Sequence, residues 1–178
     1  YGTAVVGTVS GTSITYGTPV VFQSSAAYYY ANVYEPNAQK VVIGYRDDVA
    51  SSAGTAIVGT VSGTSISFGS PVVFNSANTP FLASSFDSNA GKIVVVYKDV
   101  GNSNYGVAIV GTISGTSISF GSEVTFLAAN GGAYETVFDS SANKHVVFYD
   151  NPSDNNYGYA RVGTVSGTSI SFGTAAKF

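Results

Sequence analysis

The side chains best suited to hold a ligand are acids, amides and tyrosines that gather in a few polar loops. Carboxylate and amide groups can bind sugar hydroxyls, and a tyrosine ring can stack on the apolar face of a sugar. The candidate ligand-binding residues are Asp47, Asp48, Asp99, Asn102, Asn104, Tyr105, Asp150, Asp154, Asn155 and Tyr157. The same residue types are also typical of ordinary turns, which use them for conformational reasons alone.

Catalytic chemistry finds little support in the sequence. The chain has one histidine, no cysteine and no G-x-S-x-G motif, so a nucleophile paired with a base has almost no candidates. His145 stands where the related segments have Ile93 and Val41, which predicts a packed side chain rather than a ligand or a base. We therefore expect no catalytic residues, no metal ligands and no cofactor. A polysaccharide-degrading enzyme that uses paired acids is kept as an alternative.

The loops that carry the candidates recur with a fixed period. Four copies of an eleven-residue segment, GTVSGTSISFG and close variants, begin at residues 7, 59, 111 and 163, a step of 52 residues. Such a period indicates an array of one structural unit. The single repeat domain, 1–178, then consists of a half unit, 1–22, followed by complete units at 23–74, 75–126 and 127–178.

Each repeated segment predicts a β-hairpin closed by a type II′ turn. The first turn is centred on Gly11-Thr12, and glycine reaches the positive φ of that turn without a steric clash. An aromatic ring lying across a strand glycine compensates for the missing side chain. The turn fixes the register, which predicts four such pairs: Gly7 with Tyr16, Gly59 with Phe68, Gly111 with Phe120 and Gly163 with Phe172.

Between the hairpins, three 30-residue inserts each predict two more strands. The first strands are expected at 28–34, 80–86 and 132–138, and the second at 40–47, 92–99 and 144–151. The run from Ile93 to Tyr97 is apolar throughout, which is typical of a strand covered on both faces. The linker between the two strands starts with an acid and ends with a lysine, as in Asp87 and Lys92. This spacing predicts a salt bridge, with a calcium loop as the alternative.

Four strands per 52 residues, in this order, resemble a blade of a β-propeller. The segment FDSNAGKIVVVYKD followed by YGVAIVGTI looks like the first three strands of a blade. The segment GTVSGTSISFGSPVVF is similar to repeats of large surface and tail proteins of marine viruses and bacteria. The resemblance implies an all-β chain of tandem four-stranded antiparallel units, about three and a half blades in all. A β-trefoil, which also has three four-stranded units, is the alternative.

The composition agrees with an all-β protein and excludes several classes of partner. Apolar residues make up 44% of the chain and charged residues 10%, which argues against disorder. The net charge of −3 includes no basic cluster for nucleic acid, and no apolar run is long enough to predict a membrane span. The absence of cysteine and the low charge fit a secreted or virion protein. The start at Tyr1 indicates a processed product or a segment of a longer chain.

The identical turns and the divergent loops are expected at opposite ends of each unit. A variable surface on a fixed scaffold is typical of a binding face, and the Tyr28–Tyr30 run there is either a stacking patch or half core. We therefore expect a non-enzymatic repeat module of an extracellular or virion surface, which supplies structure and adhesion and binds a glycan or a surface receptor through the variable loops.

The alternative function is purely structural. Three and a half units leave strand edges open, and an open edge invites pairing with another chain. On this hypothesis the chain forms a homo-oligomer, either a ring or a filament, or belongs to a longer repeat array.

Overall fold

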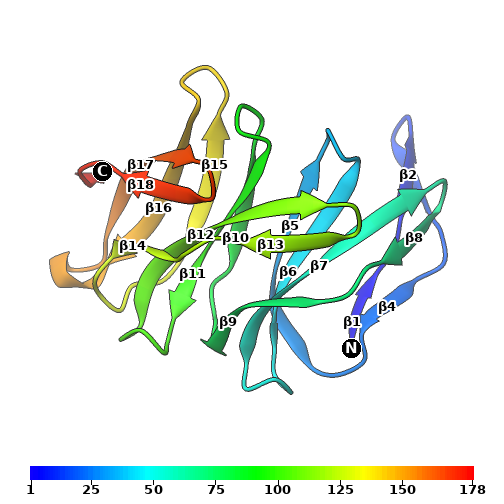
Figure 1. The fold of residues 1–178 in the computed structure, drawn as a ribbon, viewed down its shortest axis with the longest axis horizontal. Helices are drawn as coiled ribbons and strands as arrows, with labels where there is room; N and C mark the ends of the chain where they lie inside the picture. The colour runs from blue at the N-terminus through cyan, green and yellow to red at the C-terminus, as the bar shows by residue number, and fades with distance from the viewer.

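The chain is built almost entirely of β-strands. The computed structural model describes all residues, 1–178, of which 63% lie in strands, and the one helical element is a short 3-10 turn, η1 (Pro152–Asp154). The strands form small antiparallel sheets that follow one another along the molecule, with the two termini at opposite ends (Figure 1). No barrel is closed, so the alternative of a β-trefoil is wrong.

Three complete units share one topology. The first three strands of each unit pair in chain order, and the outermost strand is divided into two strands that both pair with the third. The first sheet contains β5 (Ala27–Glu35), β6 (Lys40–Asp47), β7 (Ala53–Ser62), β8 (Ser65–Phe68) and β9 (Val72–Asn78). The second sheet contains β10 (Ala83–Asp87), β11 (Lys92–Asp99), β12 (Tyr105–Ser114), β13 (Ser117–Phe120) and β14 (Val124–Leu127). The third sheet contains β15 (Glu135–Asp139), β16 (Lys144–Asn151), β17 (Tyr157–Ser166), β18 (Ser169–Phe172) and β19 (Ala176–Lys177).

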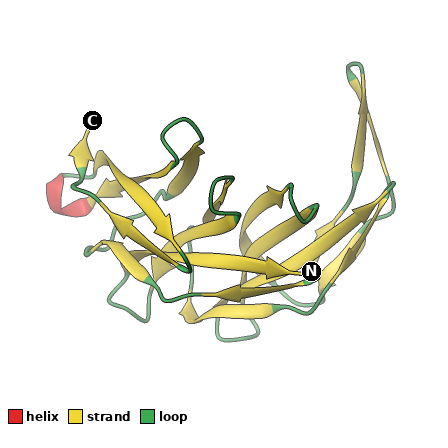
Figure 2. Ribbon diagram, turned by 45° about the horizontal axis from the view of Figure 1, so that its top comes forward, coloured by secondary structure: helices red, strands yellow, loops and turns green.

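The N-terminal residues form only the outer half of such a unit, which we call the half unit. Its strands are β1 (Gly2–Ala4), β2 (Gly7–Ser10), β3 (Ser13–Tyr16) and β4 (Val20–Gln23). Strand β1 pairs with β4, and β2 pairs with β3. Because no first and second strands lie beside them, the hairpin β2–β3 stands away from the sheets and all its strand residues are exposed (Figure 2). The predicted tandem blade-like units, three complete and one partial, are therefore present.

The repeated hairpins close as the sequence predicts. The turn glycines have φ between 58° and 61°, and the threonines that follow them have negative φ, which is the pattern of a type II′ turn. The four predicted glycine–aromatic pairs are register partners. A Cβ added to Gly111 would lie 2.9 Å from Ile118 Cδ1 and 3.0 Å from Phe120 Cε1. These two side chains therefore cover the bare backbone.

The outermost strand of the first sheet is interrupted after the hairpin. Residues 69–71 separate β8 from β9. Gly69 N–H still donates to the Val58 carbonyl at 2.9 Å, but Pro71 has no N–H with which to continue the ladder. The ladder resumes at Val72 with a shifted register. The outermost strand therefore bends where it meets the next unit.

The second strands begin and end where they are predicted, but two of the first strands begin late. Ala83 and Glu135 are each three residues beyond the expected starts. The preceding residues Phe81 and Ala133 have φ of 58° and 49°, so their left-handed backbone cannot continue a strand. The equivalent residue of the first sheet, Tyr29, also has φ of 52° and forms a bulge within β5.

Each linker between the first and second strands is closed by its acid through backbone hydrogen bonds. Asp87 Oδ1 accepts N–H groups from Asn89 and Ala90 at 2.9 and 2.8 Å. Glu35 and Asp139 accept the corresponding bonds in the other units. The lysines are the register partners of these acids, but they form no ion pair with them. The predicted salt bridge is wrong because the turn amides occupy the carboxylates.

Neighbouring units pack face to face around a repeated aromatic cluster. A phenylalanine of the earlier unit lies against a second-strand tyrosine and a hairpin phenylalanine of the next unit. At the middle junction the Phe74 ring centroid lies 5.1 Å from Tyr97 and 5.3 Å from Phe120. The other two clusters are Phe22 with Tyr45 and Phe68, and Phe126 with Tyr149 and Phe172. Full burial of one such ring stabilises the fold by about 1.5–3 kcal/mol.

The same junctions contain a glycine with no room for a side chain. A Cβ at Gly121 would lie 1.9 Å from the carbonyl oxygen of Thr168, which is in the hairpin turn of the next unit. Gly17 meets Thr64 and Gly69 meets Thr116 at the same 1.9 Å. The glycine Cα–H bond therefore points at the carbonyl oxygen, a weak hydrogen-bond geometry. We call the surface with this glycine and the cluster phenylalanine the glycine side of a unit, and the surface with the turn threonine and hairpin aromatic its turn side.

Replacing Gly121 by alanine should destabilise the fold. The new Cβ would force the second and third units apart, and overpacking of this kind costs about 1–3 kcal/mol. Gly173→Ala is the matched control, because a Cβ at Gly173 meets only the Val162 carbonyl oxygen at 3.8 Å. Urea unfolding followed by circular dichroism measures both variants. Equal unfolding free energies would show that the close approach at Gly121 does not constrain the junction.

Candidate functional site

The two sets of variable loops meet at one end of the sheets, as predicted. Thr79 N–H donates to the Ser52 carbonyl at 3.1 Å, and Val100 N–H donates to the Asn78 carbonyl at 3.1 Å. These bonds join the loop after β9 to the loops that follow β6 and β11. The SGTS turns lie at the far end of the third strands, which are ten residues long, or about 33 Å. We call the end with the variable loops the rim.

Two of the predicted ligand-binding acids accept hydrogen bonds from other residues of the fold. Asp99 is buried, and its Oδ1 accepts hydrogen bonds from Asn75 Nδ2 at 3.0 Å and from Gly101 N–H at 2.9 Å. Asp47 accepts a bond from Gln23 Nε2 at 2.5 Å. Each acid therefore joins the end of a second strand to the outermost strand of the preceding unit. The burial and the hydrogen bonds of Asp99 give this side chain a structural role.

The junction between the second and third sheets lacks such a pair. Leu127 of β14 stands in place of the amide donor, and Asn151 of β16 stands in place of the acid. Asn151 Oδ1 accepts only from Ser153 N–H, at 3.0 Å, within its own loop. An acid therefore occurs where an amide from the preceding unit can bond to it, and this pairing is structural.

The predicted amides and one tyrosine also have structural roles. Asn104 and Asn155 have φ of 62° and 51°, so they hold left-handed positions that asparagine tolerates better than most residues. Tyr105 is half-buried against the core of the second sheet. Asn102 is exposed, and its backbone closes the loop with Asp99 and Tyr105. Of these four, Asn102 and Asn155 are exposed, and the other two are partly buried.

Two further candidates form a separate cluster at the C-terminal end. Asp154 Oδ2 accepts from Tyr159 Oη at 2.7 Å and pairs with Lys177 Nζ at 2.8 Å, and these bonds lower the pKa of Asp154. The Lys177 ammonium also lies 3.5 Å from the ring centroid of Tyr157. The cluster ties β19 to the rim loop of its own unit, and it does not touch the candidates of the other two units.

The remaining candidates, Asp48 and Asp150, lie beside a row of rings and cations that runs from the first sheet to the second. Arg46 Cζ lies 5.3 Å from the Tyr28 ring centroid and 4.8 Å from that of Tyr29. The Tyr29 ring lies 5.5 Å from that of Phe81, and Lys98 Nζ lies 4.7 Å above Phe81. We call these five residues, Tyr28, Tyr29, Arg46, Phe81 and Lys98, the aromatic rim.

Fixed geometry and exposure distinguish the aromatic rim from ordinary core. Its three rings are exposed, and two of them stand on residues with left-handed backbone, Tyr29 and Phe81. A bulky residue at positive φ is uncommon and costs free energy, and such strain concentrates at binding sites. The aromatic rim is therefore the best-organised candidate site on the molecule.

The acids position the cations of the aromatic rim. Asp48 Oδ1 accepts from Arg46 Nε at 2.7 Å, which holds the guanidinium group over the two tyrosine rings. Burial lowers the pKa of the Lys98 ammonium, and the nearby Asp150 carboxylate opposes that effect. Asp150 itself accepts from Gly132 N–H at 2.6 Å. The site thus combines two cations, each beside a carboxylate, with three exposed aromatic rings.

The sequence contained a signal for these residues. Arg46, Lys98 and Asp150 are equivalent positions, the penultimate residues of the predicted second strands, and Tyr29 and Phe81 are equivalent within the inserts. The pattern of acids, amides and tyrosines in the loops does not include the two cations or Phe81. The stacking-patch reading of Tyr28–Tyr30 agrees with the exposure of all three rings.

The histidine is packed in the core, as predicted. His145 is fully buried between the second and third sheets, with Ser85 Oγ 3.0 Å from its Nδ1 and Asp87 Oδ2 3.4 Å from its Nε2. Ser85 also bonds to Thr136 at 3.1 Å. The three residue types are those of a hydrolytic triad, but the serine is itself buried and no cavity opens on it. The cluster therefore fills the core.

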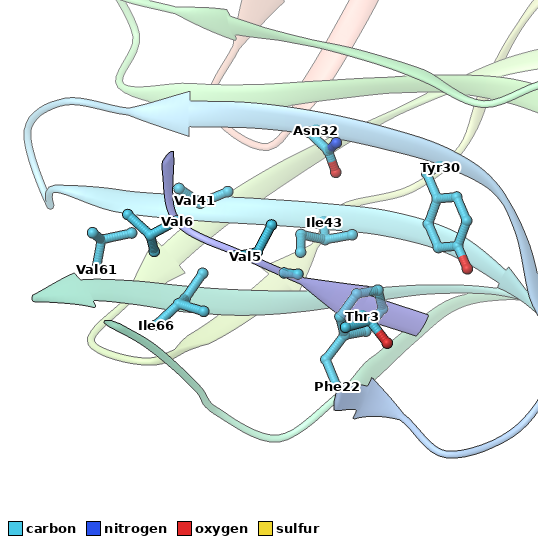
Figure 3. A pocket seen from close by; sticks show the side chains of 11 residues that line it. Thr3, Val5, Val6, Phe22, Tyr30, Asn32, Val41, Ile43, Val61 and Ile66 are labelled. Atoms are coloured by element: carbon cyan, nitrogen blue, oxygen red, sulfur yellow. The ribbon is translucent and has the colours of Figure 1, made fainter. Parts of the chain in front are cut away.

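An apolar groove of about 440 Å³ lies between the half unit and the first sheet (Figure 3). Nine of its eleven lining residues are hydrophobic, including Val5 and Val6 from the half unit and Val41 and Ile43 from β6. Between complete units this space is filled, because the second strand of the earlier unit packs there. Strand β6 fills it between the first and second sheets. With so few polar groups, the groove does not suit a sugar or another polar small molecule.

Comparison with protein-family models finds no match, and comparisons with curated proteins and with solved structures also find none. No helix in the structure has the length and hydrophobicity that a membrane crossing requires. No group of three or more histidine or acidic side chains lies close enough together to hold a metal ion.

Protonation of His145 should destabilise the fold below neutral pH. Burial lowers the pKa of this histidine, although Asp87, the one charged group in contact with it, opposes the shift. The unfolded chain takes up a proton near the ordinary value of 6.5, whereas the folded chain does so only at lower pH. Stability is therefore complete above pH 6.5 and falls as the pH decreases through it, by about 1.4 kcal/mol per pH unit at most.

Urea unfolding between pH 7.5 and 5.5 tests this dependence, because His145 is the chain's one histidine. The matched variant is His145→Ile with Ser85→Val, which places the residues of equivalent positions, Ile93 and Val33, in the core. It should remove the slope. An equal slope in both proteins would assign the pH dependence to another group.

Proposed function

We propose that the chain is a non-enzymatic repeat scaffold whose aromatic rim binds glycans at an extracellular or virion surface. The observation that carries the proposal is the row of three exposed rings and two cations from two neighbouring units. Aromatic faces stack on the apolar faces of sugars, and cations bond to carboxylate or sulfate groups. An acidic polysaccharide is therefore the ligand class that suits the site.

The extent of the site also favours a polymer over a single sugar. The aromatic rim runs from Tyr28 on the first sheet to Lys98 on the second, and the Phe81 ring then approaches Tyr134 of the third sheet at 6.4 Å. A linear chain of sugars can contact successive units of an array, so that weak contacts add. Protein surfaces with exposed acidic side chains would bind to the same rings and cations, and they are the other class of receptor.

The non-enzymatic part of the proposal has its own support. The one histidine is buried and bonded within the core, and the acids Asp47, Asp48 and Asp99 accept hydrogen bonds from the protein. None of these groups stands opposite a second catalytic partner at a cavity. The low charge and the lack of cysteine favour an extracellular or virion setting.

Removal of one ring and one cation should weaken polysaccharide binding. The variant Tyr28→Ala with Lys98→Gln loses a stacking face and a charge, for which we expect at least about tenfold weaker binding to alginate, a polyuronate. Biolayer interferometry with immobilised alginate measures the affinity, and neutral dextran tests the requirement for negative charge. Binding should also fall with added salt, because dissolved ions screen the attraction between the two cations and the polyanion.

Tyr34→Ala is the matched control for this experiment. Tyr34 is an exposed tyrosine on the same strand, β5, but at the end away from the rim. Its loss should leave binding unchanged. If the native chain binds no polysaccharide on a broad glycan array, the adhesive part of the proposal fails and the scaffold role alone is left.

A further inference from the structure

The two ends of the molecule expose the two halves of one junction. Each internal junction brings a glycine side of one unit against a turn side of the next, and the chain makes this contact three times. The third sheet has a glycine side with nothing against it, and the half unit has a turn side with nothing against it. The two exposed surfaces are therefore complementary in type.

The open glycine side is at the C-terminal end. Gly173 has space where Gly17, Gly69 and Gly121 meet a threonine carbonyl, since its added Cβ would contact only the Val162 oxygen at 3.8 Å. Phe178 holds the position of the cluster phenylalanine, and it is 74% exposed, whereas Phe126 is 1% exposed. Val162 is 48% exposed, and its counterparts Val58 and Val110 are fully buried.

The open turn side is on the hairpin β2–β3. Ile14 is 48% exposed, while its counterparts in the later hairpins are 9% exposed or less. Tyr16, which holds the place of the hairpin phenylalanines, is exposed, and no glycine of the chain approaches the carbonyl of Thr12. The hairpin projects from the molecule, so these groups are accessible to another chain (Figure 2).

We propose that copies of this chain associate head to tail, with the hairpin β2–β3 of one copy docked on the glycine side of the third sheet of the next. Gly173 then meets the Thr12 carbonyl of the second copy, Phe178 meets its Tyr16, and Val162 meets its Ile14. Each pair repeats a contact that the chain already makes at its internal junctions. The proposal does not depend on glycan binding, because the aromatic rim lies on other strands.

A second copy suits the open surface for two physical reasons. The half unit contains no charged side chain, so docking its hairpin on an apolar face removes no side-chain charge from water. The open space at Gly173 also favours this partner. A backbone carbonyl presented as in the SGTS turn fits the space that the missing side chain leaves. Since the two surfaces differ, the joint is heterologous, and repeated joints produce an open filament or a closed ring.

Concentration-dependent mass tests the proposal. Sedimentation equilibrium from micromolar concentrations to about 1 mM should show the native chain growing in mass. Gly173→Ala should stay monomeric over the whole range with an unchanged circular dichroism spectrum, because its Cβ is harmless in the monomer but would meet the Thr12 carbonyl in the joint. The control Thr174→Ala, at the next and exposed residue, should associate like the native chain.

The hairpin offers a second, independent pair of variants. Ile14→Glu places a charge on the docking face and should abolish association, whereas Thr15→Glu places it on the opposite face of β3 and should not. Neither change touches the core, because both residues are exposed. A mixture of Gly173→Ala with Ile14→Glu retains one working glycine side and one working turn side, so it should form dimers and nothing larger.

The outcomes decide the proposal in either direction. Growth of the native chain, monomers for each single variant and dimers for their mixture would establish a head-to-tail joint through these residues. A native chain that stays monomeric at the highest concentration would overturn it. Association that survives Gly173→Ala would also overturn it, as would a mixture of the two variants that stays monomeric.

Discussion

The close approach of a glycine backbone to a threonine carbonyl is the constraint on which the array depends. At each internal junction the separation leaves no space for even one methyl group. The distance fixed there brings Phe22, Phe74 and Phe126 into contact with the tyrosine and phenylalanine of the next unit. A weak contact thus sets the geometry in which strong apolar burial takes place, and it holds every unit at the same distance from its neighbour.

This constraint also gives the identical SGTS turns a physical cause. The glycine of the turn must adopt positive φ, and the threonine that follows presents the carbonyl that meets the glycine of the preceding unit. A change at either position would therefore alter the hairpin and the junction together. The rim loops are not required to form both a turn and a junction contact. They need left-handed backbone at two adjacent positions, which Ser51-Ser52, Ser103-Asn104 and Asn155-Asn156 all supply. Their divergence follows from a weaker requirement and does not by itself indicate binding.

The same distinction explains what the sequence could predict. Turn type and hairpin register follow from local geometry, because Gly-Thr at the tip determines every cross-strand pair, and the second strands have bounds set by apolar runs. The burial of Asp99 depends on the preceding unit, because its hydrogen-bond donor Asn75 lies 24 residues earlier in the chain. The residues at equivalent positions indicate part of this pairing, since Leu127 replaces the amide donor where Asn151 replaces the acid.

The placement of strain separates the scaffold from the candidate site. Outside the turns, a chain rich in serine, threonine and glycine can satisfy its backbone without bulky residues at positive φ. Yet Tyr29 and Phe81 occupy equivalent left-handed positions, where the third unit has the smaller Ala133. An aromatic residue gains nothing from that backbone, and its ring stays exposed. The rings at these positions contact Arg46 and Lys98 across two units, and the proposed glycan-binding role of the aromatic rim rests on these contacts.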